Sequence, residues 1–197
     1  MSIGIAFAAA TRVLMHESWH YLARRLLRIE SAIWIPVQSP TSNHKRHVTV
    51  GDFHIGWPFY ERGATEPWPL AKTDVDRLGT TRISGIALAA PIGMLLLGAT
   101  AFVLGLTWMP MRFAWWAAAI IWLLDSGGNV LPNPKLALER RPSTPKGSFD
   151  TTDGGVVSLL YPETKIRLIL TIIGFSIFAS TMFIFSLFFS NLSSLNR

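Results

Sequence analysis

Long apolar runs separated by polar stretches are the dominant pattern along this chain. Each run supplies roughly the 20 mostly apolar residues that a helix needs to cross a bilayer. Four such runs are present, over about residues 3–27, 83–108, 112–131 and 166–191. We therefore predict an all-α membrane protein in which residues 1–197 form a single polytopic domain with about four transmembrane helices.

The polar segment after the first run, residues 28–82, contains a second kind of pattern. Residues 47–56 alternate polar and apolar side chains, which is the period of a β-strand. Gly51 and Asp52 lie in the middle of this stretch and are suited to a tight turn. The pattern predicts a small β-hairpin. The other polar segment covers residues 132–165.

The distribution of charge supports the membrane interpretation and predicts an orientation. Half of the residues are hydrophobic and 15% are charged, whereas soluble domains carry about a quarter charged residues. Of the 18 lysines and arginines, 15 fall within residues 24–82 and 132–167. The positive-inside rule assigns these two segments to the cytoplasm. We expect a multi-pass protein of the cell membrane with both termini outward. Its partner is then the lipid bilayer and not nucleic acid, despite a net charge of +6.

The most specific motif lies in the first apolar run. His16-Glu17-Ser18-Trp19-His20 has the pattern H-E-x-x-H. Residues four apart share one face of a helix, so the two imidazoles can bind one zinc ion while Glu17 acts as general base. Ionisable side chains in an apolar helix are costly and usually functional. A rise of about 1.5 Å per residue places His16 inside the bilayer, nearer its cytoplasmic face.

A catalytic zinc site also needs a third protein ligand and an open position for water. The chain has no cysteine, so this ligand is not a thiolate. Asp153 lies on the side of the membrane assigned to His20, and the two glycines that follow it allow a close backbone approach. Asp125 is the main rival because of its similar depth. The full set of acidic candidates is Asp125, Glu139, Asp150, Asp153 and Glu163.

Two further segments, taken with H-E-x-x-H, resemble the site-2 protease family of intramembrane zinc metalloproteases. They are Asn129-Val130-Leu131-Pro132 at the end of the third run and Asp153-Gly154 after an insertion. The resemblance implies that Asp153 is the third zinc ligand. It also implies that Asn129 lies beside the active site, where it binds substrate or stabilises the oxyanion. Residues 47–56 resemble the membrane-associated β element of the family, and the segment ending at Pro91 resembles its second core helix.

This resemblance implies a minimal family member without a PDZ domain, with one zinc ion per chain. Such a protein is a zinc endopeptidase whose zinc-activated water cleaves peptide bonds within or beside the membrane. Its expected substrate is a membrane protein with a single-pass transmembrane segment. Two residues depart from the family pattern, since Trp19 replaces a small residue and Met94 replaces an asparagine. These departures concern substrate geometry rather than the zinc ligands.

Two other functions stay open at this point. A membrane-anchored zincin that acts on cytosolic or misfolded proteins would take Glu139 or Glu163 as its third ligand. A catalytically inactive member would serve as a membrane scaffold or binding protein, but such a protein has no need of Glu17.

Three histidines of the polar segment and one arginine of the first apolar run also require an explanation. A second metal site could use His44, His47 and His54, although solvated loop histidines explain them more simply. Arg12 precedes His16 by four residues on the same helical face. In an apolar helix this arginine needs a partner, such as Asp125, or a route to the headgroups.

Overall fold

The computed structural model describes residues 2–35, 48–56, 64–66, 72–132 and 152–194. Most of these residues are helical, and a small sheet accompanies the helices, as predicted. A short helix, α5 (Asp153–Leu160), was not predicted. The four long helices coincide with the four apolar runs: α1 (Ser2–Leu26), α2 (Lys72–Thr107), α3 (Arg112–Val130) and α6 (Thr164–Ser194).

The second long helix extends beyond its apolar run at the N-terminal end. It begins at Lys72 rather than at residue 83, and its first turns are too polar to have been counted as membrane-spanning sequence. Gly79 interrupts it with φ 69° and ψ 171°, a conformation open to glycine and strained for other residues. The apolar part of α2 therefore starts close to the predicted boundary.

Two helices of the described part of the chain, α2 and α6, are long and apolar enough to cross a membrane. The helices α1 and α3 are not apolar enough to meet this criterion for a membrane-spanning helix, because polar side chains interrupt their apolar sequence. His16 and Glu17 are such residues in α1, and Asp125 is one in α3. The four-crossing topology accordingly stays a prediction.

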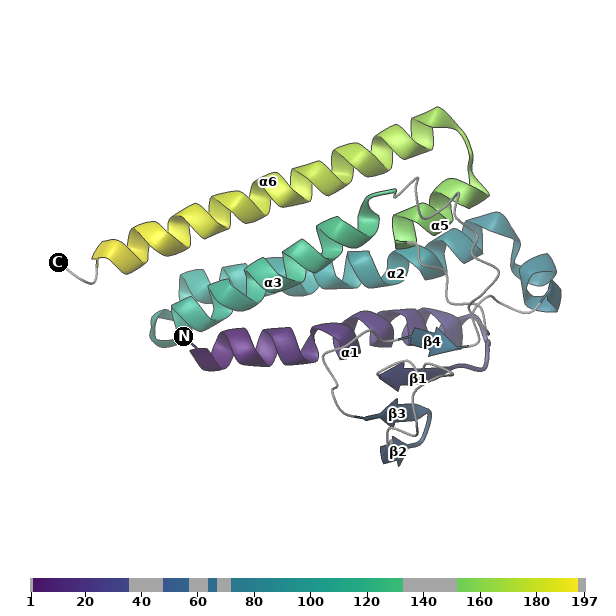
Figure 1. The fold of residues 1–197 in the computed structure, drawn as a ribbon, viewed down its shortest axis with the longest axis horizontal. Coiled ribbons are helices and arrows are strands. Elements are labelled where there is room, and N and C mark those ends of the chain that lie inside the picture. Colours follow the sequence, from purple (N-terminus) through teal and green to yellow (C-terminus); the bar gives the residue numbers. More distant parts are fainter. Residues whose placement is uncertain (1, 36–47, 57–63, 67–71, 133–151, 195–197) are drawn as a thin grey trace.

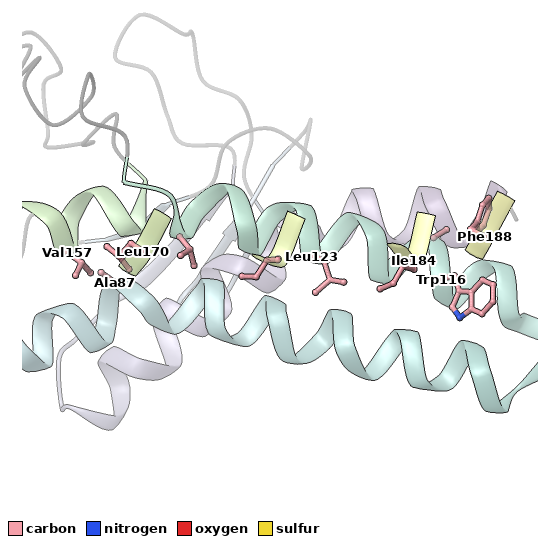
Figure 2. Packing of buried hydrophobic residues seen from close by; sticks show 10 residues of the cluster. Ala87, Trp116, Leu123, Val157, Leu170, Ile184 and Phe188 are labelled. Carbon is pink, nitrogen blue, oxygen red and sulfur yellow. The ribbon is translucent and has the colours of Figure 1, made fainter. Parts of the chain in front are cut away.

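The arrangement of the long helices separates the two ends of the bundle. Figure 1 shows both chain ends and the α2–α3 connection, which includes the 3-10 turn Met109–Met111, towards one end. The sheet and α5 lie towards the other end. Helix α3 packs against α1, α2 and α6 and so forms the centre of the bundle. Figure 2 shows the buried apolar residues between α3 and its neighbours, among them Leu123, Trp116 and Ile184.

Small residues allow α1, α2 and α3 to approach one another closely. A Cβ atom added at Gly93 in α2 would lie 2.2 Å from the indole ring of Trp19 in α1. Similarly, a Cβ at Gly98 would lie 2.6 Å from Leu123 in α3. Contacts of this kind are typical of membrane helix interfaces, where small residues let neighbouring helices pack tightly. The Trp19–Gly93 contact shows how the chain accommodates a large residue within its H-E-x-x-H motif.

The predicted hairpin is present and forms part of a larger sheet. Strands β2 (Val48–Val50) and β3 (Phe53–Ile55) pair antiparallel around Gly51, whose φ is 58°. Strand β1 (Ala32–Ile35) pairs parallel to β3, and β4 (Ala64–Glu66) pairs antiparallel to β1. The strand order is therefore β2-β3-β1-β4. Strands β1 and β4 were not predicted.

The sheet is fastened to the helix that carries the H-E-x-x-H motif. Val13 of α1 packs in one buried cluster with Ile33 and Ile35 of β1. Tyr21, next to His20, donates a hydrogen bond of 2.6 Å from its hydroxyl to Asp52 Oδ2 in the hairpin turn. These contacts hold the sheet beside the candidate site. Its association with a membrane remains a prediction.

Candidate metal centre

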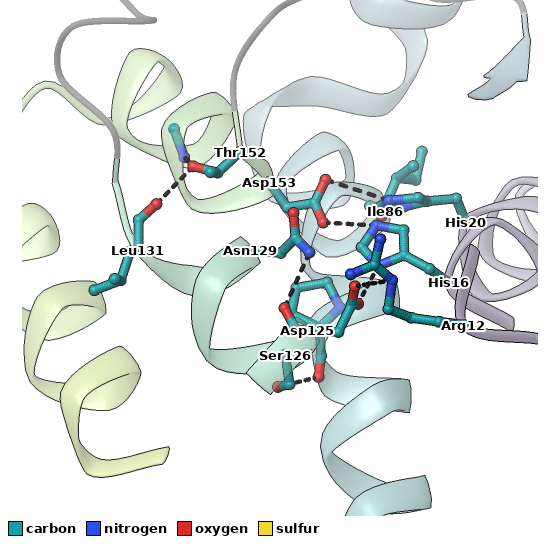
Figure 3. A network of polar contacts seen from close by, with 12 residues as sticks. Arg12, His16, His20, Ile86, Asp125, Ser126, Asn129, Leu131, Thr152 and Asp153 are labelled. Carbon is teal, nitrogen blue, oxygen red and sulfur yellow. Dashed lines mark hydrogen bonds and ion pairs between the residues drawn. The ribbon is translucent and has the colours of Figure 1, made fainter. Parts of the chain in front are cut away.

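Three side chains from α1 and from the start of α5 converge in one place. His16 and His20 project from α1, and Asp153 is the first residue of α5 (Figure 3). His16 Nε2 lies 3.3 Å from Asp153 Oδ2, and His20 Nε2 lies 3.2 Å from Asp153 Oδ1. Each residue offers one ligand atom, and these atoms lie within 4.8 Å of one another. The group can therefore hold a metal ion.

The partners of the two Nδ1 atoms define which ring nitrogens face this group. His16 Nδ1 lies 2.8 Å from Asp125 Oδ2, and His20 Nδ1 lies 2.9 Å from the carbonyl oxygen of Ile86. A carboxylate and a carbonyl only accept hydrogen bonds, so each Nδ1 must carry the proton and donate it. In the neutral form of each imidazole, which is the form in which histidine binds metal, the Nε2 lone pair then points towards Asp153.

The distances within the group are compatible with a metal site. Charge-assisted hydrogen bonds between nitrogen and carboxylate oxygen are about 2.7–2.9 Å long. Ligand atoms about 2.0–2.1 Å from a tetrahedral zinc ion are about 3.3 Å apart. The two observed separations, 3.2 and 3.3 Å, agree with the second value. In addition, Asp153 Oδ2 is buried and makes no hydrogen bond to a described residue. The two Nε2 lone pairs and the Asp153 carboxylate are all electron-pair donors, and a cation between them would stabilise the group.

The position of Asp153 depends on how α5 begins. Thr152 is the N-cap residue, and its hydroxyl oxygen accepts a hydrogen bond of 3.0 Å from the Gly155 amide. The same hydroxyl donates to the carbonyl oxygen of Leu131 at 2.5 Å. A Cβ atom at Gly154 would lie only 1.8 Å from the carbonyl oxygen of Val130. Hence α5 docks directly on the end of α3, and only glycine fits at this contact.

Burial and charge act in opposite directions on the Asp153 carboxyl. Burial raises its pKa, but the positive charge that His20 and His16 carry when protonated, together with their hydrogen bonds, lowers it by more, and the resulting pKa lies below the usual range of an aspartate. Asp153 is thus an anionic carboxylate at neutral pH, as a metal ligand has to be.

Two residues given roles at the sequence level lie next to this group. Glu17 follows His16 on α1, and only 9% of its surface is exposed. Asn129 directly precedes Val130, whose carbonyl oxygen lies against Gly154 next to Asp153, and its side-chain amide donates to the Asp125 carbonyl oxygen within α3 at 3.0 Å (Figure 3). Both residues are therefore close to the candidate metal ligands, while their chemical roles stay predictions.

Asp125, the main rival for the third ligand, occupies a different position. It contacts the Nδ1 side of His16, opposite the side that faces Asp153, and its other oxygen lies 3.5 Å from Arg12 Nε. Of the two arrangements left open for Arg12, the pairing with Asp125 is therefore the one present. The contact from Asp125 to His16 was not predicted, because hydropathy and motif spacing carry no information on which side of an imidazole a carboxylate lies.

The remaining candidates are separate from the group. Glu163 is exposed near the start of α6. His54 stacks on Trp34 with ring centroids 3.8 Å apart, and its Nδ1 lies 3.0 Å from the Thr49 hydroxyl. Within the described residues, His16, His20 and Asp153 form the one group of this kind. The other sequence candidates, Glu139, Asp150, His44 and His47, lie outside the described residues.

Comparisons with models of protein families, with curated proteins and with solved structures find no match to this chain. The resemblance to site-2 proteases accordingly rests on the motifs themselves and stays a prediction.

Proposed function

We propose that this protein is an intramembrane zinc endopeptidase of the site-2 protease type. The observation that supports this most is the convergence of His16 Nε2, His20 Nε2 and Asp153 from α1 and α5. The motif predicted His16 and His20 as the first two ligands, and Asp153, 133 positions after His20, is the proposed third.

The donor set favours zinc among the common metals. Two imidazoles and one carboxylate suit zinc, whereas magnesium and calcium prefer sites made of oxygen ligands. Three protein ligands leave a fourth position for water or substrate, which distinguishes catalytic zinc sites from structural ones. Zinc bound here would polarise the scissile carbonyl and lower the pKa of the attacking water.

The protein's own residues perform the remaining steps. Glu17 takes the proton from the attacking water and then delivers it to the leaving amine. Two observations support this role: Glu17 follows His16 in α1, and it is buried. Asn129 is suited to bind the substrate backbone or the developing oxyanion with its amide when that amide turns from its own helix.

The membrane placement follows from the helices and the charges together. We infer that α1, α2, α3 and α6 all cross the bilayer, with the segments 28–82 and 132–165 in the cytoplasm. The location of both chain ends at one end of the bundle supports this topology (Figure 1). The metal centre then lies near the cytoplasmic face. A transmembrane helix that unwinds readily is the expected substrate, because a peptide bond must leave its helix to reach the zinc.

The test compares wild-type protein with Glu17→Gln, both purified in detergent and supplied with a fluorogenic transmembrane peptide. We expect wild type to bind one zinc ion and to cleave the peptide. Glu17→Gln keeps the zinc and loses about 10²- to 10⁴-fold in kcat, the usual range for removal of a general base. Glu163→Gln, an exposed glutamate, is the control and retains activity. Cleavage by Glu17→Gln at the wild-type rate would contradict the proposed mechanism.

A further inference from the structure

The partners of the two histidines differ in charge, although the histidines themselves are equivalent in the motif. His20 donates from Nδ1 to a neutral carbonyl, that of Ile86, at 2.9 Å. His16 donates from Nδ1 to a carboxylate, that of Asp125, at 2.8 Å. Pairing with a carboxylate makes an imidazole a stronger metal ligand and fixes its ring orientation.

Asp125 is held in place for this contact. It lies in α3, at the centre of the bundle, and its side chain is 9% exposed. A buried carboxylate requires compensation, and Arg12 provides it from one turn before His16, with Nε 3.5 Å from Asp125 Oδ1. The Arg12 side chain is 47% exposed, so the chain Arg12–Asp125–His16 leads from the surface of the bundle to the metal group.

We propose that Asp125 is a positioning residue of the metal centre, which holds the His16 ring in the orientation and tautomer that present Nε2 to the metal. This inference rests on the metal centre of the proposed function. It adds a residue that binds neither metal nor substrate. Asp125 acts only through His16, and Arg12 acts only through Asp125.

A purely structural role for Asp125 would be to join α3 to α1. The two roles differ in what they affect. A structural contact contributes to folding stability whether or not metal is present. A positioning contact sets the affinity for the metal and the electronic environment of the bound ion, even when the folded bundle is intact.

The experiment uses the full-length chain in detergent, stripped of metal and titrated with zinc against a chromophoric chelator. We expect Asp125→Asn to weaken zinc binding about 10- to 100-fold, the range found when the partner of a ligating histidine is removed. Asp125→Glu restores part of the affinity. Asp74→Asn is the matched control, because Asp74 pairs with Arg77 outside the centre and its loss leaves zinc binding unchanged.

Two further measurements distinguish the positioning role of Asp125 from a purely structural contact between α3 and α1 and from direct binding of the metal. The absorption spectrum of bound Co²⁺ shifts in Asp125→Asn, while the thermal unfolding of the metal-free protein stays close to wild type. Unchanged zinc affinity and an unchanged Co²⁺ spectrum would overturn the positioning role and leave the proposed protease intact. Complete loss of zinc from Asp125→Asn, with zinc retained by Asp153→Ala, would make Asp125 a ligand and overturn it as well. A wild-type chain that binds no zinc would overturn this inference together with the proposed function.

Discussion

The two halves of the metal centre are built in different ways. The half from α1 places His16 and His20 on one face by the geometry of a single helix, so four residues of spacing are enough. The half from α5 places Asp153 through contacts between distant segments: the Thr152 cap, the carbonyl of Leu131 and the missing Cβ of Gly154. The first half is local and robust, whereas the second depends on the docking of an eight-residue helix.

Removal of the Asp153 carboxylate, the ligand that α5 supplies, has the largest expected effect on zinc affinity. Asp153→Ala leaves two histidines without their common anionic partner, and its zinc affinity falls by more than the roughly 10- to 100-fold effect of losing a partner of a ligand. Metal analysis of the purified variant measures this, with Glu163→Ala as the control. Full zinc occupancy in Asp153→Ala, with loss in Asp125→Ala or Asp150→Ala, would assign the third ligand elsewhere.

Displacement of helix α5 from α3 has the second largest expected effect on zinc affinity. Gly154→Ala brings a methyl group to 1.8 Å from the Val130 carbonyl oxygen, so α5 has to move away from α3. Overpacking of this kind costs about 1–3 kcal/mol, which corresponds to roughly 5- to 150-fold weaker zinc binding. Gly128→Ala is the matched control, since no atom lies within 4 Å of its added Cβ. Equal zinc affinities of the two variants would show that α5 docking does not position Asp153.

The smallest effect in this series comes from the helix cap. Thr152→Val keeps the shape of the side chain but loses the hydrogen bonds to Gly155 and Leu131. Loss of an N-cap costs about 1 kcal/mol, equivalent to roughly fivefold in zinc affinity. Thr152→Ser retains the hydroxyl and should bind zinc like wild type in the same titration. Zinc affinity of Thr152→Val equal to that of wild type would show that the cap does not contribute to the position of Asp153.

The same division explains what the sequence could predict. The apolar runs predicted the four long helices to within a few residues, apart from the start of α2, because helix length follows the apolar run. The alternation in residues 47–56 predicted the β2–β3 hairpin. The spacing within H-E-x-x-H predicted that His16 and His20 share a face, and their side chains do converge.

The parts of the structure that the sequence did not predict depend on contacts between residues far apart in the chain. Strands β1 and β4 are three or four residues long and show no diagnostic alternation. Helix α5 starts with two glycines after Asp153, which disfavour a helix unless tertiary contacts hold it. The contact between His16 and Asp125 joins residues 109 positions apart. The position of Asp153 itself required the family resemblance, since the acidic residues alone left five candidates.

The contact between Trp19 and Gly93 links two positions that the motif pattern treats as independent. With an indole at position 19, position 93 has no room for any side chain, because even one added carbon would lie 2.2 Å from the ring. A protein with a small residue at position 19 escapes this restriction and can carry a bulkier neighbour on its second core helix. We therefore expect positions 19 and 93 to vary together during divergence. In related chains, a reduction in size at one should accompany or precede growth at the other.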